Sequence, residues 1–400
     1  MTGGELVNSS QILSAARSLA ADVVADRREI HRHPELKFQE HLTAGLVARR
    51  LEELGIEVRT GVGETGVVGL LRGGRAGKTV LLRADMDALP IDEQSDVEYR
   101  SQNPGVMHAC GHDGHTAMLL GVAHLLSDLR RDLPGCVKFM FQPGEEGGAG
   151  ALRMIEQGLL EDPPVDAAFA LHVDALHYAG EVALRTGPTM AAVDDFIITV
   201  RGKGGHAARP HLAVDPVVVA AHIVTVLQTI VSREVDPNDQ AVVTVGSLTS
   251  GTTFNVIPDI ATIKGTIRTY NPELRGQIGQ RIEELASAVA SGMRATAEMQ
   301  YFAGYPPLVN HESGIELVRE AVTEILGAEA IVPKEQVMGA EDFSYVLQRV
   351  PGAMFHLGVR DRSWREPRPI HNSSFDMSEE ALPIGVAAMA ATALRFLHEP

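Results

Sequence analysis

The chain has 400 residues, of which 44% are hydrophobic and 22% charged, the balance of a globular protein long enough for two domains. Its formal net charge of −17 argues against nucleic acid and anionic membranes as partners, because both are bound by basic surfaces. No apolar run is long enough to cross a bilayer, no signal-peptide pattern opens the chain, and two cysteines imply no disulfide framework, so we expect a cytoplasmic protein.

The first part of the chain alternates predicted helices and strands. Apolar residues at helical spacing predict helices over 12–25, 42–54 and 116–129. Short apolar runs predict strands over 66–71, 79–82, 136–141 and 167–173. This alternation favours an α/β domain with a mostly parallel central sheet and helices on both faces.

The order of elements changes after residue 188. A strand, a helix, two strands, a helix and a strand are predicted over 195–201, 215–232, 241–248, 261–269, 272–290 and 297–302. That order, βαββαβ, is typical of a ferredoxin-like unit. The first pattern then resumes, with elements over 314–326, 353–357 and 380–397. We therefore expect a discontinuous domain, 1–188 with 304–400, and an inserted domain, 189–303.

Polar residues follow three of the predicted strands in the first domain. Asp85 and Asp87 follow one strand, Glu145 and Glu146 follow another, and His172 lies at the end of a third. In open α/β sheets, sites form at the carboxyl ends of strands. Adjacent carboxylates can also divide labour between binding a metal and acting as a general base. Taken singly, the aspartate pair fits a capped turn equally well, and the glutamate pair is also common in acidic loops. A lone histidine such as His172 is more often a core residue than a ligand.

The segment 107–115 is the strongest chemical signal in the chain. It places three histidines, a cysteine and an aspartate within eight residues, just before a predicted helix. Thiolate and imidazole are the usual ligands of zinc-like ions. Crowding so many polar groups would be costly for a purely structural segment. The segment therefore predicts a metal site, in which His115 either supports the ligands or caps the helix.

Two later loops carry further candidate residues. The loop 202–211 in the inserted domain contains His206 and fits a solvated turn as well as a functional loop, and His371 lies in a loop near the C-terminus. No nucleophile elbow, phosphate-binding loop or dinucleotide fingerprint is present. A cysteine hydrolase built on Cys110 would leave the glutamate pair and the additional histidines without a role.

Together these segments resemble the M20 metallopeptidase and amidohydrolase group. The closest resemblance is to the branch that contains N-acyl-amino acid amidohydrolases, hippurate hydrolases and auxin-conjugate (IAA-amino acid) hydrolases. The match runs in order along nearly the whole chain and is most specific in 108–115. The matching segments are 30–35, 82–90, 107–115, 145–151, 202–206, 253–258 and 339–343.

The resemblance implies a centre of two divalent metal ions per chain, zinc or manganese, with cobalt or nickel as alternatives. Cys110 would be the bridging thiolate, Asp87 would orient the ligands, and Glu145 would be the catalytic base. The implied metal ligands are Cys110, His112, Glu146, His172 and His371.

The resemblance also implies a role for the inserted domain as a lid and as the site of assembly into a homodimer or homotetramer. His206 would reach the active site of the partner chain. Asn255 and Arg268 fall where relatives contact the carboxylate of the substrate.

The expected reaction is the metal-dependent hydrolysis of a small N-acyl amino acid (acetyl, benzoyl or similar) to a carboxylic acid and a free amino acid. Glu145 would take a proton from the attacking water, and His206 together with one ion would stabilise the oxyanion. Two alternatives stay open. One is a dipeptidase, aminopeptidase or carboxypeptidase of the same group, and the other is a metal-binding protein without turnover, such as a sensor or store.

Overall fold

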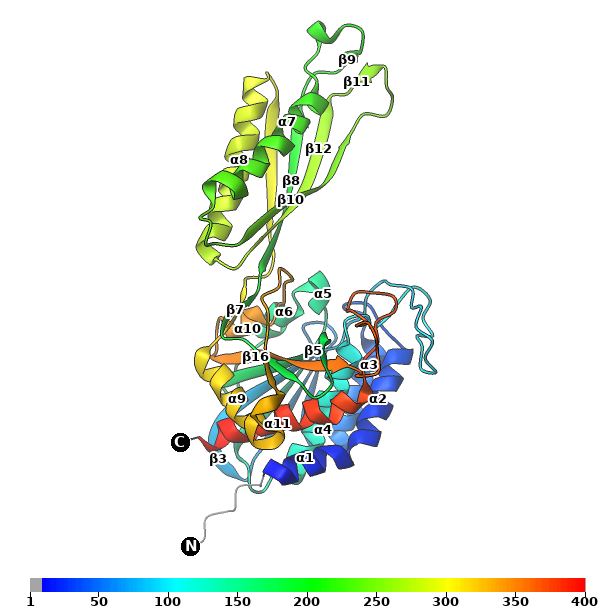
Figure 1. Cartoon of the computed structure of the whole chain (residues 1–400), viewed down its shortest axis with the longest axis vertical. Helices are drawn as coiled ribbons and strands as arrows, with labels where there is room; N and C mark the ends of the chain where they lie inside the picture. The colour runs from blue at the N-terminus through cyan, green and yellow to red at the C-terminus, as the bar shows by residue number, and fades with distance from the viewer. Residues whose placement is uncertain (1–8, 400) are drawn as a thin grey trace. The chain divides into compact units, whose positions relative to one another are not determined.

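The computed structural model describes residues 9–399, which divide into two compact units (Figure 1). Unit 1 contains residues 9–187, 309–335 and 342–399, and unit 2 contains 188–308 and 336–341. The short segment 336–341 belongs to unit 2 because its backbone pairs there. Val337 N–H donates to Thr189 O at 3.1 Å, and Ala191 N–H donates to Gly339 O at 2.8 Å. The inserted domain expected from the sequence, 189–303, is close to the first part of unit 2 but did not include this segment.

An eight-stranded mixed sheet forms the centre of unit 1, in the order β1-β2-β4-β3-β5-β16-β6-β15. The four central strands, β4, β3, β5 and β16, pair in parallel, whereas the pairs β1–β2, β2–β4 and β16–β6 are antiparallel. Parallel pairing brings the carboxyl ends of the central strands to one edge of the sheet. The strands are β1 (Glu57–Val62), β2 (Gly66–Arg72), β3 (Arg75–Asp85), β4 (Pro134–Gln142), β5 (Ala167–Tyr178), β6 (Val182–Leu184), β15 (Ile331–Pro333) and β16 (Gly352–Arg360).

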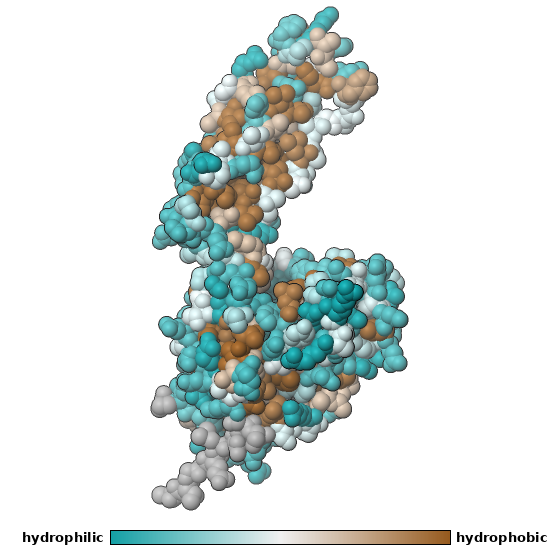
Figure 2. Space-filling view, in the orientation of Figure 1, coloured by the Kyte–Doolittle hydropathy of each residue, from teal (hydrophilic) through white to brown (hydrophobic). Residues whose placement is uncertain are grey.

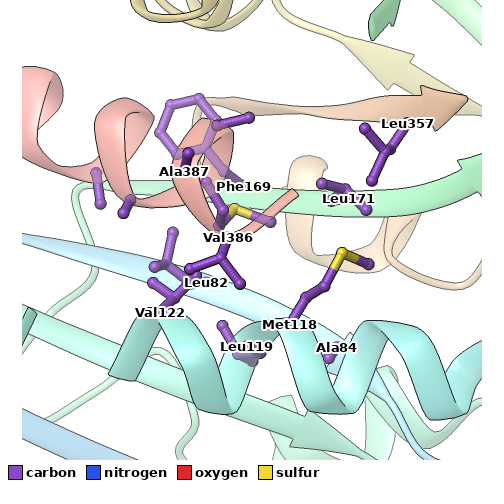
Figure 3. Close-up of a cluster of buried hydrophobic side chains, with 14 of the residues drawn as sticks. Leu82, Ala84, Met118, Leu119, Val122, Phe169, Leu171, Leu357, Val386 and Ala387 are labelled. Atoms are coloured by element: carbon purple, nitrogen blue, oxygen red, sulfur yellow. The ribbon is translucent and has the colours of Figure 1, made fainter. Parts of the chain in front are cut away.

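The long helices cover one face of this sheet and enclose the main hydrophobic core (Figure 3). Val80, Leu82 and Ala84 alternate along β3 into this core, where they meet apolar side chains of α4 and α11. Although the helix Glu379–His398, which includes α11, is long and apolar enough to span a membrane, 72% of its apolar window is buried, as expected of a core helix. The helices on this face are α1 (Ser9–Ser18), α2 (Ala20–Arg32), α3 (His41–Glu53), α4 (His112–Asp128), α9 (Glu312–Leu326) and α11 (Leu382–His398).

The opposite face of the central strands is also buried. Leu81 and Arg83 point away from the main core yet are 0% and 1% exposed. Burial on both faces explains why β3, β4 and β5 are nearly continuous apolar runs rather than alternating ones. Short elements complete the unit: α5 (Glu145–Gly148), α6 (Gly150–Glu156), α10 (Ser344–Leu347), η3 (Ala328–Ala330) and η4 (Glu379–Ala381).

Unit 2 is built around a four-stranded antiparallel sheet in the order β10-β12-β8-β13, with α7 and α8 against one face. The chain order β8-α7-β10-β12-α8-β13 is the predicted βαββαβ unit. The elements are β8 (Ala192–Arg201), α7 (Pro216–Thr229), β10 (Ala241–Ser250), β12 (Ile260–Thr269), α8 (Pro272–Gly292) and β13 (Thr296–Ala303).

Several short strands and helical turns connect the main elements of unit 2. Two short strands, β9 and β11, pair with each other, and β7 and β14 pair where the chain passes from one unit to the other. The bounds of these elements are β7 (Gly187–Met190), β9 (Gly205–His206), η1 (Pro210–Leu212), η2 (Ile230–Glu234), β11 (Val256–Ile257) and β14 (Leu308–Asn310).

Candidate metal centre

The candidate site lies at the carboxyl ends of the central strands of unit 1. Cys110 and His112 flank Gly111, which precedes the first residue of α4. Gly111 has a φ of +83°, and a Cβ atom there would lie 2.5 Å from Val173 Cγ2. Only glycine fits this left-handed and crowded position, so Gly111 brings both potential ligands close to Val173, in the middle of β5.

The five side chains implied as metal ligands fall into two groups of three that share Cys110. The first group is Cys110, His112 and His172, and the second is Cys110, Glu146 and His371. Within each group the potential ligand atoms all lie within 4.8 Å of one another. Two ions held by these groups would have the Cys110 thiolate in common, which is the arrangement of a bridged dinuclear centre.

His172 presents one ring nitrogen to the site. Its Nδ1 lies 2.7 Å from Val173 O, a carbonyl that can only accept, so Nδ1 carries the proton. The Nε2 lone pair then points to the Cys110 side, where Sγ is 3.5 Å away. A backbone acceptor that fixes the tautomer in this way is the usual support of a metal-binding histidine.

Asp87 connects the segment that carries Glu145 and Glu146 to α4, the helix that begins at His112. Its Oδ1 and Oδ2 accept the backbone N–H groups of Glu145 and Glu146 at 3.0 and 2.9 Å. The same Oδ1 lies 3.3 Å from His112 Nδ1. One carboxylate thus contacts two potential ligands, Glu146 in α5 and His112 in α4.

Glu145 lies beside one member of each of these groups, His112 and Glu146, and belongs to neither of the two that share Cys110. It follows Gly144, whose φ is +58° and whose N–H donates to Glu40 Oε1 at 2.9 Å. The carboxylate oxygens of Glu145 and Glu146 and a ring nitrogen of His112 all lie within 4.8 Å of one another. Glu145 is 7% exposed. A carboxylate next to the ligands but outside their two groups can exchange protons with a reacting molecule.

The donor set fits divalent cations. Both ring nitrogens of His112 are buried and make no hydrogen bond of good geometry to the described residues, a costly state that a bound ion would relieve. Burial raises the pKa of the Cys110 thiol. Hydrogen bonds with Cys110 and Glu146 raise the pKa of His371 to about 10. The group of donors therefore attracts positive charge, and thiolate, imidazole and carboxylate together suit divalent metal ions.

His115 is excluded as a ligand by its own hydrogen bonds. Its Nδ1 lies 2.6 Å from Asp85 Oδ1, and its Nε2 accepts the Val173 N–H at 2.9 Å. Both nitrogens are therefore occupied, and His115 connects the end of β3 to the strand that carries His172. Asp85 also forms an ion pair with Arg83, with Nη1 and Oδ2 2.9 Å apart. Of the two interpretations open for His115, the supporting role is the one that its contacts favour.

The three remaining candidates lie in unit 2. His206 forms β9, is exposed, and accepts the Ala208 N–H on Nδ1 at 3.1 Å. Asn255 accepts the Ala207 N–H on its backbone oxygen at 3.2 Å, which places it beside His206. Arg268 is half-buried in β12, and its Nη1 donates to Ile267 O at 3.0 Å. Within the loop 202–211, Gly205 and His206 pair with Ile257 and Val256 of β11.

Comparison with known proteins agrees with this geometry. A family model described as peptidase family M20/M25/M40 matches residues 81–395. The chain belongs to this family. It is accordingly a metal-dependent hydrolase of the amidohydrolase and peptidase type, and the resemblance inferred from its motifs is confirmed.

Individual relatives of this M20-family chain cover nearly its whole length. It is 42% identical to thermostable carboxypeptidase 2 of Saccharolobus solfataricus over 381 residues, and the aligned region covers 94% of this chain and 96% of that protein. It is 40% identical over 366 residues to the N-acetyl-L-cysteine deacetylase of Bacillus subtilis, covering 91% and 86%. The solved structure of the Bacillus subtilis YXEP protein, a dinuclear metal binding peptidase from the M20 family, is 35% identical, with a TM-score of 0.83 and 95% and 99% of the two chains covered.

Several buried residues around the centre carried no clear signal in the sequence. Arg27 is fully buried behind α4, where its Nε donates to Asp113 Oδ2 at 2.7 Å. His31 Nδ1 lies 2.8 Å from the same oxygen. His31 falls within a motif that matches the family, but neither its partner nor the burial of Arg27 could be deduced from local pattern.

Proposed function

We propose that this M20-family hydrolase cleaves the amide bond of N-acyl amino acids, with acetyl, benzoyl or similar acyl groups, to a carboxylic acid and a free amino acid. The observation that carries the proposal is the placement of Glu145 beside two ligand groups that share Cys110. The similarity to an N-acetyl-L-cysteine deacetylase supports the choice of substrate class.

The chemistry divides between the ions and the side chains. When bound, the two ions would lower the pKa of a water molecule and polarise the acyl carbonyl. Glu145 accepts the proton of that water and then delivers it to the departing nitrogen. Asp87 holds the Glu145 backbone in place, as its 3.0 Å hydrogen bond allows. Asn255 and Arg268 bind the substrate carboxylate, for which an amide and a guanidinium are suitable donors.

A second candidate function is peptide hydrolysis, as a dipeptidase or carboxypeptidase. The similarity to thermostable carboxypeptidase 2 favours it, and the same centre would serve both reactions. Storage or sensing of metal without turnover is the weaker candidate, because it leaves Glu145 without a task.

Metal removal followed by a substrate panel tests the proposal. We expect chelator-treated protein to lose hydrolysis of N-acetyl and N-benzoyl amino acids, and to recover it as zinc, manganese, cobalt or nickel restores about two ions per chain. Dipeptides and carboxypeptidase substrates, assayed in parallel by amine release, provide the comparison. Faster cleavage of peptides would favour the second candidate. Tight metal binding with no turnover would favour storage, and activity that survives complete metal removal would contradict the mechanism.

We further propose that the chain works as a homodimer or homotetramer assembled through unit 2. The apolar helix formed by α7 and η2 has only 33% of its apolar window buried, and Figure 2 displays hydrophobic side chains over this part of the unit. Val217 and Val218 on α7 are 38% and 45% exposed. Strand β10 lies at an edge of the sheet. An apolar surface beside a free strand edge favours pairing with a second copy.

Mixed dimers test the proposal that His206 acts in the partner's active site. A dimer that pairs a His206→Ala chain with a Glu145→Gln chain contains one complete site if His206 acts in trans, and none if it acts in cis. We expect purified mixed dimers to show about half of wild-type activity, because one site of two is complete. Each homodimer of a single variant is the control, and mixed dimers as inactive as these controls would contradict the proposal.

We place this hydrolase in the cytoplasm. Cys110 and Cys136 are both free thiols, which suits a reducing compartment. Oxidising conditions would put the Cys110 thiol at risk as a ligand.

A further inference from the structure

The loop that carries His371 has a strained backbone. His371 has a φ of +59°, a left-handed conformation that residues with a Cβ atom rarely adopt. Its N–H donates to Ala109 O at 2.7 Å, next to Cys110. The His371 side chain is 52% exposed, whereas His112 and His172 are buried. The second ligand group therefore depends on an exposed residue whose conformation other contacts must maintain.

Asp376, which follows His371 in sequence, bonds to a residue that precedes it. Arg368 Nη1 donates to Asp376 Oδ2 at 2.7 Å, so the ion pair joins residues that flank His371 in sequence. The Tyr99 hydroxyl donates to Asp376 Oδ1 at 3.3 Å, and the Met377 N–H donates to the same oxygen at 2.9 Å. Asp376 is 7% exposed, so its carboxylate is largely shielded from competing water.

Arg27 joins the base of this loop to the ligand helix. Its Nη2 lies 3.9 Å from Asp376 Oδ1, and its Nε donates to Asp113 Oδ2 at 2.7 Å. Asp113 directly follows the potential ligand His112 in α4. A third carboxylate, Glu379, accepts from Nη1 at 3.3 Å. One buried guanidinium thus bridges the segment after His371 and the first turn of α4.

We propose that Arg368, Asp376 and Arg27 form a clamp that positions His371 and thereby sets the affinity of the second ligand group for its ion. The clamp acts through His371, so these are positioning residues. Arg27 also contacts Asp113 beside His112, so Arg368 and Asp376 are the members of the clamp that act on the second group alone. The first group has other supports, because His112 lies in α4, Cys110 just before it, and His172 in β5. The inference rests on the proposed centre of two ions and assigns separate supports to its two halves.

Stepwise metal titration of the full-length protein tests the clamp. Zinc would be added to metal-free wild type, Arg368→Ala and Asp376→Asn, with both affinities measured by calorimetry and bound zinc counted after dialysis. We expect the weaker-binding ion to lose about 10–100-fold in affinity in both variants, the usual effect of removing a group that supports a ligand. The affinity of the other ion should stay within about twofold of wild type. Arg365→Ala, an exposed arginine of the same loop, is the matched control and should bind zinc like wild type.

The outcomes separate the clamp from the centre itself. Unchanged affinities in both clamp variants would overturn the clamp, and so would an equal loss at both ions, which would point to general support of α4. If Asp376→Asn does not fold, Arg368→Ala decides, because the Arg368 side chain is 41% exposed and its removal should spare the core. Wild-type protein that binds fewer than two ions would overturn the dinuclear centre and the clamp with it.

Discussion

Replacement of Glu145 by glutamine is expected to lower kcat about 10²–10⁴-fold while the protein keeps both metal ions. The amide has nearly the shape of the carboxylate but cannot accept a proton from water. Glu145 lies outside the two groups that share Cys110, so metal binding should survive the change. The hydrogen bond from residue 145 to Asp87 is donated by the backbone N–H, so a glutamine at this position can still form it. The measurement is kcat on an N-acetyl amino acid together with the count of bound metal.

Glu146→Gln is the matched control for this experiment. It makes the same chemical change one residue further along, at a side chain that belongs to the second ligand group. We expect this variant to lose activity together with metal rather than with metal retained. Near-normal turnover of a metal-loaded Glu145→Gln protein would show that another group acts as the base.

Replacement of Cys110 by alanine is expected to abolish binding of both ions, because both ligand groups include its sulfur. We expect each affinity to fall more than about 100-fold, the upper end of the losses caused by residues that only support a ligand. His172→Ala should instead weaken one ion and leave the other, since His172 belongs to a single group. Metal counting after dialysis of each variant provides the measurement.

Cys136→Ala controls for the loss of a thiol. Cys136 lies in β4, partly exposed and away from the ligand groups, so its loss should leave two ions bound. If Cys110→Ala retained one ion at wild-type affinity, the shared role of its sulfur would be contradicted.

The helices and strands that could be predicted from the sequence are those in which the pattern of apolar residues reflects which positions are buried. The strands predicted at 79–82, 136–141 and 167–173 are the buried parts of β3, β4 and β5, where apolar residues run on without alternation. Strand β1 was not predicted, because it is largely exposed at the edge of the sheet and carries few apolar residues. The pairing of β9 with β11 was also missed, since two-residue strands have no period to detect.

The sequence alone determined the chemistry of this protein. The cysteine and histidines of 107–115, together with carboxylates after apolar strands, predicted a metal site from residue type and spacing. The resemblance of the motifs to the M20 group then implied a hydrolase and the roles of Cys110 and Glu145. These inferences depend on residue type and on neighbours along the chain, both of which are visible in the sequence.

Only the tertiary structure decided which polar residues support the centre. His115 stands three residues after His112, yet it bonds to Asp85 and to the Val173 backbone. Arg27 reaches Asp376 from the other end of the chain. Such pairings depend on the order of strands in the sheet and on the packing of α2 and α4. Local spacing fixes what lies on one strand or helix, whereas contacts between elements exist only once the core has formed.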